Sequence, residues 1–256
     1  MEFEASKLQD TKENYIEGRN AVLEAYRSGK TIDKLFVLDG CQDGPVKSIT
    51  REARKHDSII NYVTKDRLDQ ISQTGKHQGV IAVAAAYSYV EVDDILNIAK
   101  EKGEDPFVII LDGIEDPHNL GAILRTANLA GAHGVIIRKR RAVGLTPTVA
   151  KTSAGAINYT PVAKVTNISN TIKELKDKGM WFVCADMGGT SMYDLNLTGS
   201  IGLVIGNEGD GVSKLVKENC DMIASIPMKG DIDSLNASVA TGVLAYEIVR
   251  QRINKG

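Results

Sequence analysis

The chain has 256 residues, a formal net charge of −2 and 43% hydrophobic residues, a composition typical of a soluble globular protein. No apolar run reaches the roughly 18 residues of a membrane span, and the polar stretch 1–14 lacks the apolar core of a signal peptide. We therefore expect a cytoplasmic protein with no membrane partner. Three dispersed cysteines and four histidines show no ligand spacing, which predicts reduced thiols and no metal site.

The first part of the chain predicts a small α/β domain over residues 15–88, after a flexible N-terminus over 1–14. Apolar residues with helical period alternate here with short apolar runs typical of strands. The predicted helices cover 16–27, 46–55 and 65–72, and the predicted strands cover 35–38, 59–63 and 80–84.

A linker is predicted over 89–105, holding a short helix over 92–102 that ends at the turn-forming Gly103-Glu-Asp-Pro106. A second α/β domain is predicted over 106–256. Its first run, 107–111, is wholly apolar, as in a parallel sheet covered on both faces. Further strands are predicted over 134–137, 181–185, 201–205 and 222–226, and helices are predicted to begin near Asn119 and to run from 236 to 252.

Three segments of the second domain place Gly, Asn and charged residues directly after apolar runs. They read DGIEDPHNLGAILR over 112–125, LVIGNEGDGVS over 203–213 and IPMKGDIDSLNASVA over 226–240. Ligands of α/β proteins bind at the carboxyl ends of the strands. The three segments therefore predict one composite ligand site.

Together these segments resemble the three motifs of the SpoU (TrmH-type) branch of the SPOUT methyltransferases. Members of this family transfer a methyl group from S-adenosylmethionine to a ribose 2′-hydroxyl of RNA. The resemblance covers nearly the whole chain. Within the family, the chain is similar in detail to the bacterial 23S rRNA guanosine-2′-O-methyltransferase subgroup of RlmB type. That subgroup is matched by IEGRNAVLEA at 16–25, HQGV at 77–80 and KRRAVGL at 139–145.

The resemblance implies an N-terminal L30e-like RNA-binding domain and a C-terminal SPOUT domain of α/β class with a trefoil knot. It also implies S-adenosylmethionine as cofactor, no metal, and a homodimer formed by the knotted domains. The last predicted helix carries an apolar stripe that serves either this interface or the core, namely Ala240, Val243, Leu244 and Ile248.

The resemblance further implies the residues of the site. The catalytic set is Asn119, Arg125, Glu208, Ser234 and Asn236, and the cofactor-binding set is Gly206, Ile226, Leu235 and Asn236. Simpler roles remain open, because Asn119, Ser234 and Asn236 are also suited to N-capping a helix. Glu208 could be an ordinary loop carboxylate, and Arg125 a surface cation or a partner of Asp112 or Glu115.

Proton transfer sets different expectations for the two charged residues. A guanidinium stays protonated in proteins, so Arg125 is expected to position an RNA phosphate and to stabilise the developing alkoxide. Glu208 could orient Arg125 or receive the proton.

RNA contact is expected at local basic clusters, because the chain as a whole is slightly acidic. The dense cluster Arg138, Lys139, Arg140 and Arg141 predicts either phosphate contact or a solvated loop. In the first domain, Arg19, Lys76, His77 and Gln78 are candidates for RNA recognition or are ordinary surface. The expected substrate is a guanosine of large-subunit rRNA. The alternatives are tRNA, another rRNA position, or a non-catalytic RNA-binding assembly factor.

Overall fold

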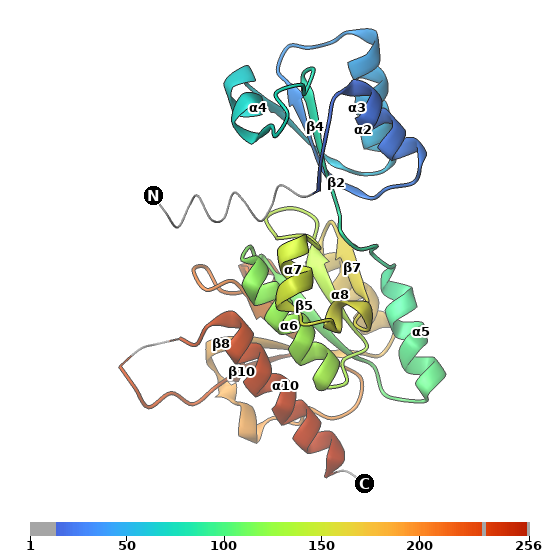
Figure 1. Cartoon of the computed structure of the whole chain (residues 1–256). Helices are drawn as coiled ribbons and strands as arrows, with labels where there is room; N and C mark the ends of the chain where they lie inside the picture. The colour runs from blue at the N-terminus through green and yellow to red at the C-terminus, as the bar shows by residue number, and fades with distance from the viewer. Residues whose placement is uncertain (1–13, 232–233, 255–256) are drawn as a thin grey trace. The chain divides into compact units, whose positions relative to one another are not determined.

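The computed structural model describes residues 14–231 and 234–254, so the predicted flexible N-terminus lies outside the described residues except for Asn14. The chain separates into two compact units, both shown in Figure 1. Unit 1 holds the residues up to Ser88 together with 144–148, and unit 2 holds 89–143 and the residues from 149 onward. None of the described helices is long and apolar enough to span a membrane.

Unit 1 is an α/β sandwich whose described sheet has the strand order β1-β4-β2-β3. Side chains alternate across β2, so that Leu35 and Val37 pack under α2 and α3, whereas Phe36 and Leu38 pack toward α4. The strands are β1 (Tyr15–Glu17), β2 (Ile32–Leu38), β3 (Ile59–Val63) and β4 (Val80–Ala84), and the helices are α2 (Arg19–Arg27), α3 (Gly44–Lys55) and α4 (Lys65–Ile71).

The helix predicted over 16–27 is wrong at its start. Ile16 and Glu17 belong to β1, which pairs antiparallel with β4 at the edge of the sheet. The chain turns at Gly18, whose φ of 89° lies in the left-handed region, and α2 begins after it.

Unit 2 is a parallel sheet with the described order β10-β8-β9-β5-β6-β7. Strand β5 lies inside the sheet and is buried along its whole length, as its apolar sequence predicted. The strands are β5 (Phe107–Asp112), β6 (Gly134–Arg138), β7 (Val162–Val165), β8 (Trp181–Ser191), β9 (Ile201–Gly206) and β10 (Met222–Ser225). The helices are α5 (Val92–Lys102), α6 (Pro117–Leu129), α7 (Pro147–Thr152), α8 (Ile168–Asp177), α9 (Lys214–Asn219) and α10 (Ala237–Ile253).

The predicted linker over 89–105 belongs to unit 2 instead, although its helix has the predicted bounds. Ile95 and Ala99 of α5 are fully buried, and Ile95 joins the core beneath β5 and β6. Gly134 opens β6 directly under this helix, where an added Cβ would lie 2.6 Å from Cδ1 of Ile95. The apolar face of α5 is therefore a layer of the domain rather than a tether.

Candidate active site at the strand ends of unit 2

A cavity of about 410 Å³ opens where β9 and β10 end, beside residues 185–187 in the middle of β8. Two of the three signature segments form much of its wall, including Gly206, Glu208, Ile226, Ser234 and Leu235. This size falls within the ~300–1,000 Å³ that small-molecule sites occupy. The predicted cofactor residues Gly206, Ile226 and Leu235 thus lie on one cavity, whereas Asn236 lies beside its lining.

Gly206 permits the chain to fold back on itself at the cavity. An added Cβ at this position would lie 2.0 Å from the carbonyl carbon of Gly211, an overlap that no side-chain movement relieves. The turn that follows is stabilised by Asn207, whose Oδ1 accepts hydrogen bonds from the backbone of Gly209 at 2.9 Å and of Asp210 at 2.6 Å. The loop 206–213 is thereby closed by its own backbone and one amide side chain.

Three predicted catalytic residues, one from each signature segment, meet through their side chains. Asn119 donates from Nδ2 to Oε1 of Glu208 at 2.5 Å. Asn236 donates from Nδ2 to the same oxygen at 2.9 Å and to Oδ1 of Asn119 at 3.0 Å. One oxygen of Glu208 thus joins Asn119, which lies 89 residues before it, to Asn236, which lies 28 residues after it.

Helix capping decides how these amides are presented. The expectation that Asn119 caps α6 is wrong, because Asp116 is the N-cap and accepts from His118, with Pro117 opening the helix. Asn119 therefore lies in the first turn with its side chain available to Glu208. The cap at α10 is confirmed, since Oδ1 of Asn236 accepts from Ser238 at 2.9 Å and from Val239 at 3.4 Å.

Arg125 is not brought to this junction within one chain. It is exposed on α6, does not line the cavity, and has no hydrogen-bond or ion-pair partner among the described residues. The partner suggested by the sequence, Asp112, is bound by Arg138 instead, at 2.9 Å. The Arg125 guanidinium is therefore accessible from solvent.

Asp186 is a cavity residue that the sequence motifs missed. Its Oδ2 lies 2.7 Å from Nζ of Lys217, and its Oδ1 accepts from the backbone of Gly188 at 3.1 Å. The hydrogen bond from Lys217 lowers the pKa of Asp186, so this carboxylate is held ionised at the cavity wall as one half of an ion pair. The available signal was its place directly after the predicted strand 181–185.

The residues of the basic cluster 138–141, at the end of β6, have different roles. Arg138 is bound to the buried Asp112, so this residue holds the fold together and is not a free phosphate ligand. Arg140 and Arg141 are exposed, and Arg141 adopts a left-handed φ of 53° in the turn. Anion contact by this cluster therefore centres on its later residues.

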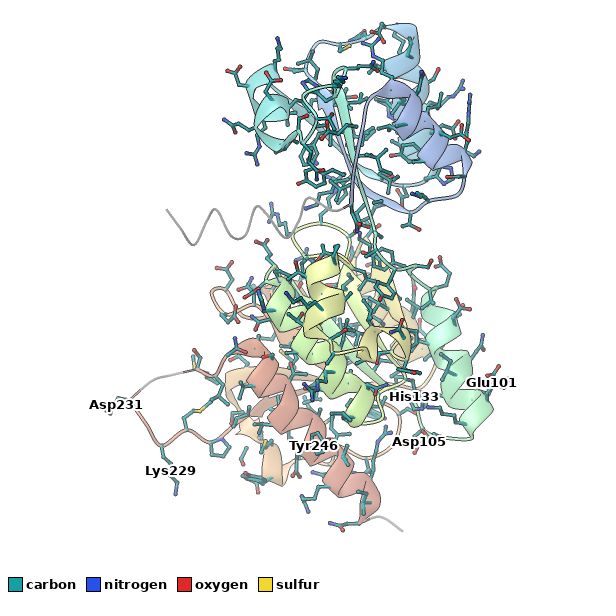
Figure 2. The ribbon with its side chains drawn as sticks, viewed as in Figure 1. Glu101, Asp105, His133, Lys229, Asp231 and Tyr246 are labelled. Atoms are coloured by element: carbon teal, nitrogen blue, oxygen red, sulfur yellow. The ribbon has the colours of Figure 1, made fainter. Side chains whose placement is uncertain are left out.

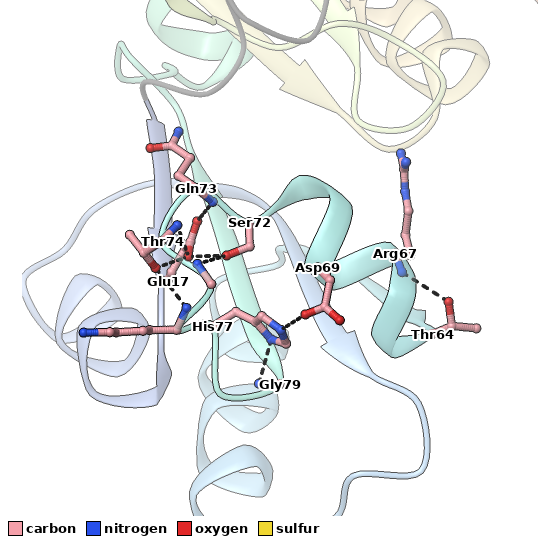
Figure 3. A network of polar contacts seen from close by, with 11 residues as sticks. Glu17, Thr64, Arg67, Asp69, Ser72, Gln73, Thr74, His77 and Gly79 are labelled. Carbon is pink, nitrogen blue, oxygen red and sulfur yellow. Dashed lines mark hydrogen bonds and ion pairs between the residues drawn. The ribbon is translucent and has the colours of Figure 1, made fainter.

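The unit 1 candidates also divide into structural and exposed groups. His77 is only 7% exposed, with Nε2 2.9 Å from Oδ1 of Asp69 and Nδ1 accepting from Gly79 at 3.0 Å (Figure 3). Gln78 is held by Arg19, whose Nε donates to the Gln78 carbonyl at 3.0 Å. Lys76 has an exposed side chain with no partner among the described residues.

Glu17 organises the loop that carries these residues, a role not predicted from the sequence. Its carboxylate accepts from Oγ of Ser72 at 2.7 Å, from the backbone of Gln73 at 2.5 Å and from Oγ1 of Thr74 at 2.5 Å (Figure 3). Burial of this carboxylate opposes its charge, but the hydrogen bonds outweigh burial and lower the pKa of Glu17. Loop 72–79 is thus preformed.

The described residues contain no cluster of three or more His, Cys, Asp or Glu side chains arranged to hold a metal ion. The protein chemistry available at the cavity is therefore that of amides, one bridging carboxylate, the Asp186–Lys217 pair and closely approaching backbone.

Comparison with known proteins places this site in a family. Residues 106–246 match the SpoU rRNA Methylase family, and residues 15–90 match the RNA 2'-O ribose methyltransferase substrate binding family. YacO of Bacillus subtilis, named as a TrmH family tRNA/rRNA methyltransferase, is 48% identical over 93% of this chain and 96% of its own.

Solved structures agree with this placement. The SpoU methyltransferase AviRb of Streptomyces viridochromogenes, crystallised with S-adenosylmethionine, is 25% identical with a TM-score of 0.59, over 94% of this chain and 90% of its own. The TrmH/SpoU tRNA modifying enzyme of A. aeolicus is 28% identical with a TM-score of 0.54, over 64% and 85%. Two motif segments line one cavity, the third is joined to them through Asn119, and both halves of the chain are matched, so the chain belongs to the SpoU (TrmH) family of RNA methylases.

Proposed function

We propose that this protein is an S-adenosylmethionine-dependent methyltransferase that modifies the ribose 2′-hydroxyl of a guanosine in 23S rRNA. The observation that carries the proposal is the Asn119–Glu208–Asn236 junction at the edge of the cavity. The name of YacO, a TrmH family tRNA/rRNA methyltransferase, supports the reaction class but does not distinguish tRNA from rRNA as substrate. The preference for 23S rRNA rests on the resemblance of the 16–25, 77–80 and 139–145 stretches.

The cavity fits the proposed cofactor in size and in charge. S-adenosylmethionine supplies an electrophilic methyl group on a positively charged sulfur. The chain offers the Asp186 carboxylate and the backbone of Gly206, Ile226 and Leu235 on the cavity wall. Asp186, Glu208 and Asp210 line the cavity and none of its described lining residues is Lys, Arg or His, a balance that favours a cationic ligand, and backbone amides and carbonyls can bind the polar ends of that ligand.

The protein residues act mainly by position and electrostatics. Arg125, which is always protonated but does not contact the junction within one chain, is the cation that we assign to an RNA phosphate next to the reacting ribose, where it would stabilise the oxygen as it loses its proton. Glu208 is fixed by the two amides and lines the cavity, so it is the carboxylate that we assign to orient the ribose or to receive that proton. Ser234 lies exposed on the cavity wall, where its hydroxyl is available to either ligand.

We further propose that unit 1 is an L30e-like RNA-binding domain and that unit 2 carries the trefoil knot of SPOUT proteins. Family membership supports both assignments. Residues 15–88 would then select the RNA and residues 106–256 would carry out the transfer, with α5 as part of the second domain.

A homodimer through unit 2 completes the proposal. Helices α6 and α10 pack on each other and expose large apolar side chains, namely Leu129 (65%), Val239 (50%), Tyr246 (50%) and Ile253 (73%) (Figure 2 labels Tyr246). Exposed apolar groups gathered in this way are typical of protein interfaces. Of the stripe predicted earlier, Leu244 and Ile248 lie in the core instead.

The test is methyl transfer from labelled S-adenosylmethionine to total RNA that lacks its native 2′-O-methyl groups, mapped to the nucleotide. Label at one guanosine ribose of large-subunit rRNA is the expected result. Label in tRNA would keep the reaction and move the substrate. Cofactor binding without label in any RNA would indicate either that the substrate is an assembling ribosomal particle or that the protein is a non-catalytic RNA binder.

A further inference from the structure

Asp112 is a buried carboxylate that the proposed reaction does not use. It ends β5, is 2% exposed, and has both oxygens engaged. Its Oδ1 accepts from Nη1 of Arg138 at 2.9 Å, and its Oδ2 accepts from the backbone of Ser213 at 2.8 Å. A buried charge is stable only with such partners, so Asp112 ties the end of β6 to the start of α9.

The turn after Asp112 touches the same two segments again. The backbone of Val143 donates to the Ile114 carbonyl at 2.9 Å. At Gly113, with φ of 89°, the Cβ position lies 3.4 Å from Nδ2 of Asn207 and 3.7 Å from the Arg141 carbonyl. The turn 112–114 is thus packed between the basic segment 138–143 and the loop 206–213.

These two segments serve different ligands in the proposed function. The basic segment exposes Arg140 and Arg141, which suit RNA phosphates. The loop 206–213 supplies cavity wall from Gly206 to Gly211, including Glu208. A phosphate that orders the first segment therefore acts on a turn in direct contact with the second.

We propose that Asp112 and Arg138 are positioning residues that couple RNA binding at segment 138–143 to cofactor binding at loop 206–213. This inference rests on the proposed function and adds a regulation of its site. Coupling between two ligands is reciprocal, so each one strengthens the binding of the other by the same factor. Observed couplings are commonly about 5- to 150-fold.

The experiment measures this factor directly. S-adenosylhomocysteine, which cannot donate a methyl group, is titrated by calorimetry into the full chain, alone and saturated with an in-vitro transcript of large-subunit rRNA. A tRNA transcript is run in parallel. Wild-type protein is expected to bind S-adenosylhomocysteine at least about fivefold tighter with RNA present. In Asp112→Asn and Arg138→Gln this ratio should fall to near one.

Asp221 provides a matched control within unit 2. Its carboxylate also combines an ion pair, at 2.5 Å to Lys176, with a backbone hydrogen bond, at 2.8 Å from Phe182, but it does not line the cavity. Asp221→Asn should keep the wild-type ratio. If Asp112→Asn does not fold, the double variant Arg140→Gln/Arg141→Gln removes only exposed side chains and should also lower the ratio.

Any one of the following results would overturn the inference. The first is a wild-type ratio of one, the second is a wild-type ratio retained in the folded Asp112, Arg138 and Arg140/Arg141 variants, and the third is an equal loss in Asp221→Asn. Weaker binding of both ligands with the ratio intact would show a purely structural role and would also refute it. Wild-type protein that binds neither ligand would refute the proposed function itself, a result distinct from binding without coupling.

Discussion

At the scale of single residues, the position of Arg125 separates binding from turnover. Because this side chain is exposed and away from the cavity lining, Arg125→Ala should leave cofactor affinity unchanged. Loss of the charge that we propose stabilises the transition state should lower kcat by about 100-fold or more. Single-turnover methylation and calorimetry measure the two effects, with the exposed Lys173→Ala as control. Near-normal turnover in Arg125→Ala would remove this residue from the mechanism.

Glu17 gives unit 1 an acid-sensitive loop. Its folded pKa is lowered, so its contribution to stability is complete above the unfolded pKa and is lost as pH falls through the folded pKa. The protection factors of the Gln73 and Thr74 amides, which correct for the intrinsic pH dependence of exchange, should therefore fall on acidification in the wild type. In Glu17→Gln these protection factors should be lower already at neutral pH and should depend less on pH. The exposed Glu24→Gln serves as control, and unchanged exchange in Glu17→Gln would contradict the assignment.

The motif residues were predictable to the extent that each acts in its own segment. Gly206 ends β9 and Ile226 follows β10, and the family resemblance added Leu235 and the role of all three as cofactor residues. Their partners were not predictable in the same way. The bond from Ser213 to Asp112 joins residues 101 positions apart, and no local pattern carries that information.

At the scale of elements, periodicity was sufficient where one face of the element is buried and its ends carry breakers. Strands β3 and β4 and helix α5 have the predicted bounds. The start of α2 and the role of α5 needed tertiary structure. Ile16 fits a helical stripe as well as an edge strand, and only pairing with β4 decides between them.

Helix α5 provides a direct test of its place in unit 2. Ile95→Ala removes a fully buried side chain over Gly134 and leaves a cavity that backbone alone lines on one side. Its free energy of unfolding in urea should fall by about 2–5 kcal/mol. The exposed neighbour Asn97→Ala should change it little. Equal effects of both substitutions would return the segment to the role of a linker.

At the scale of the whole molecule, strand order lies beyond reach of the sequence pattern. The apolar run of β5 predicts a buried parallel strand but does not identify its neighbours. One neighbour is β6, the next strand along the chain, and the other is β9, where Ile201 pairs with Phe107. Which strands become neighbours is decided by the packing of the whole domain. Two domains, by contrast, follow from composition and the change of pattern near residue 90.

The proposed homodimer gives a prediction at this scale. Tyr246→Glu places a charge amid the exposed apolar side chains of α10 and should shift sedimentation from dimer to monomer at micromolar concentration. Tyr62→Glu, an equally exposed tyrosine of unit 1, is the control and should remain dimeric. Monomeric wild-type protein, or a dimer that tolerates Tyr246→Glu, would contradict this interface.

The cavity rim also has a chemical consequence. Met187 and Met228 line the cavity and are 65% and 40% exposed, whereas Met180 and Met192 are almost fully buried. Thioethers in contact with solvent are oxidised first to sulfoxides, which are polar. Mild peroxide should therefore mark the rim before the core, and any occupant of the cavity should slow that marking. The rate at which Met187 and Met228 are oxidised, measured by mass spectrometry, should therefore report whether the cavity is occupied, and no added label is needed.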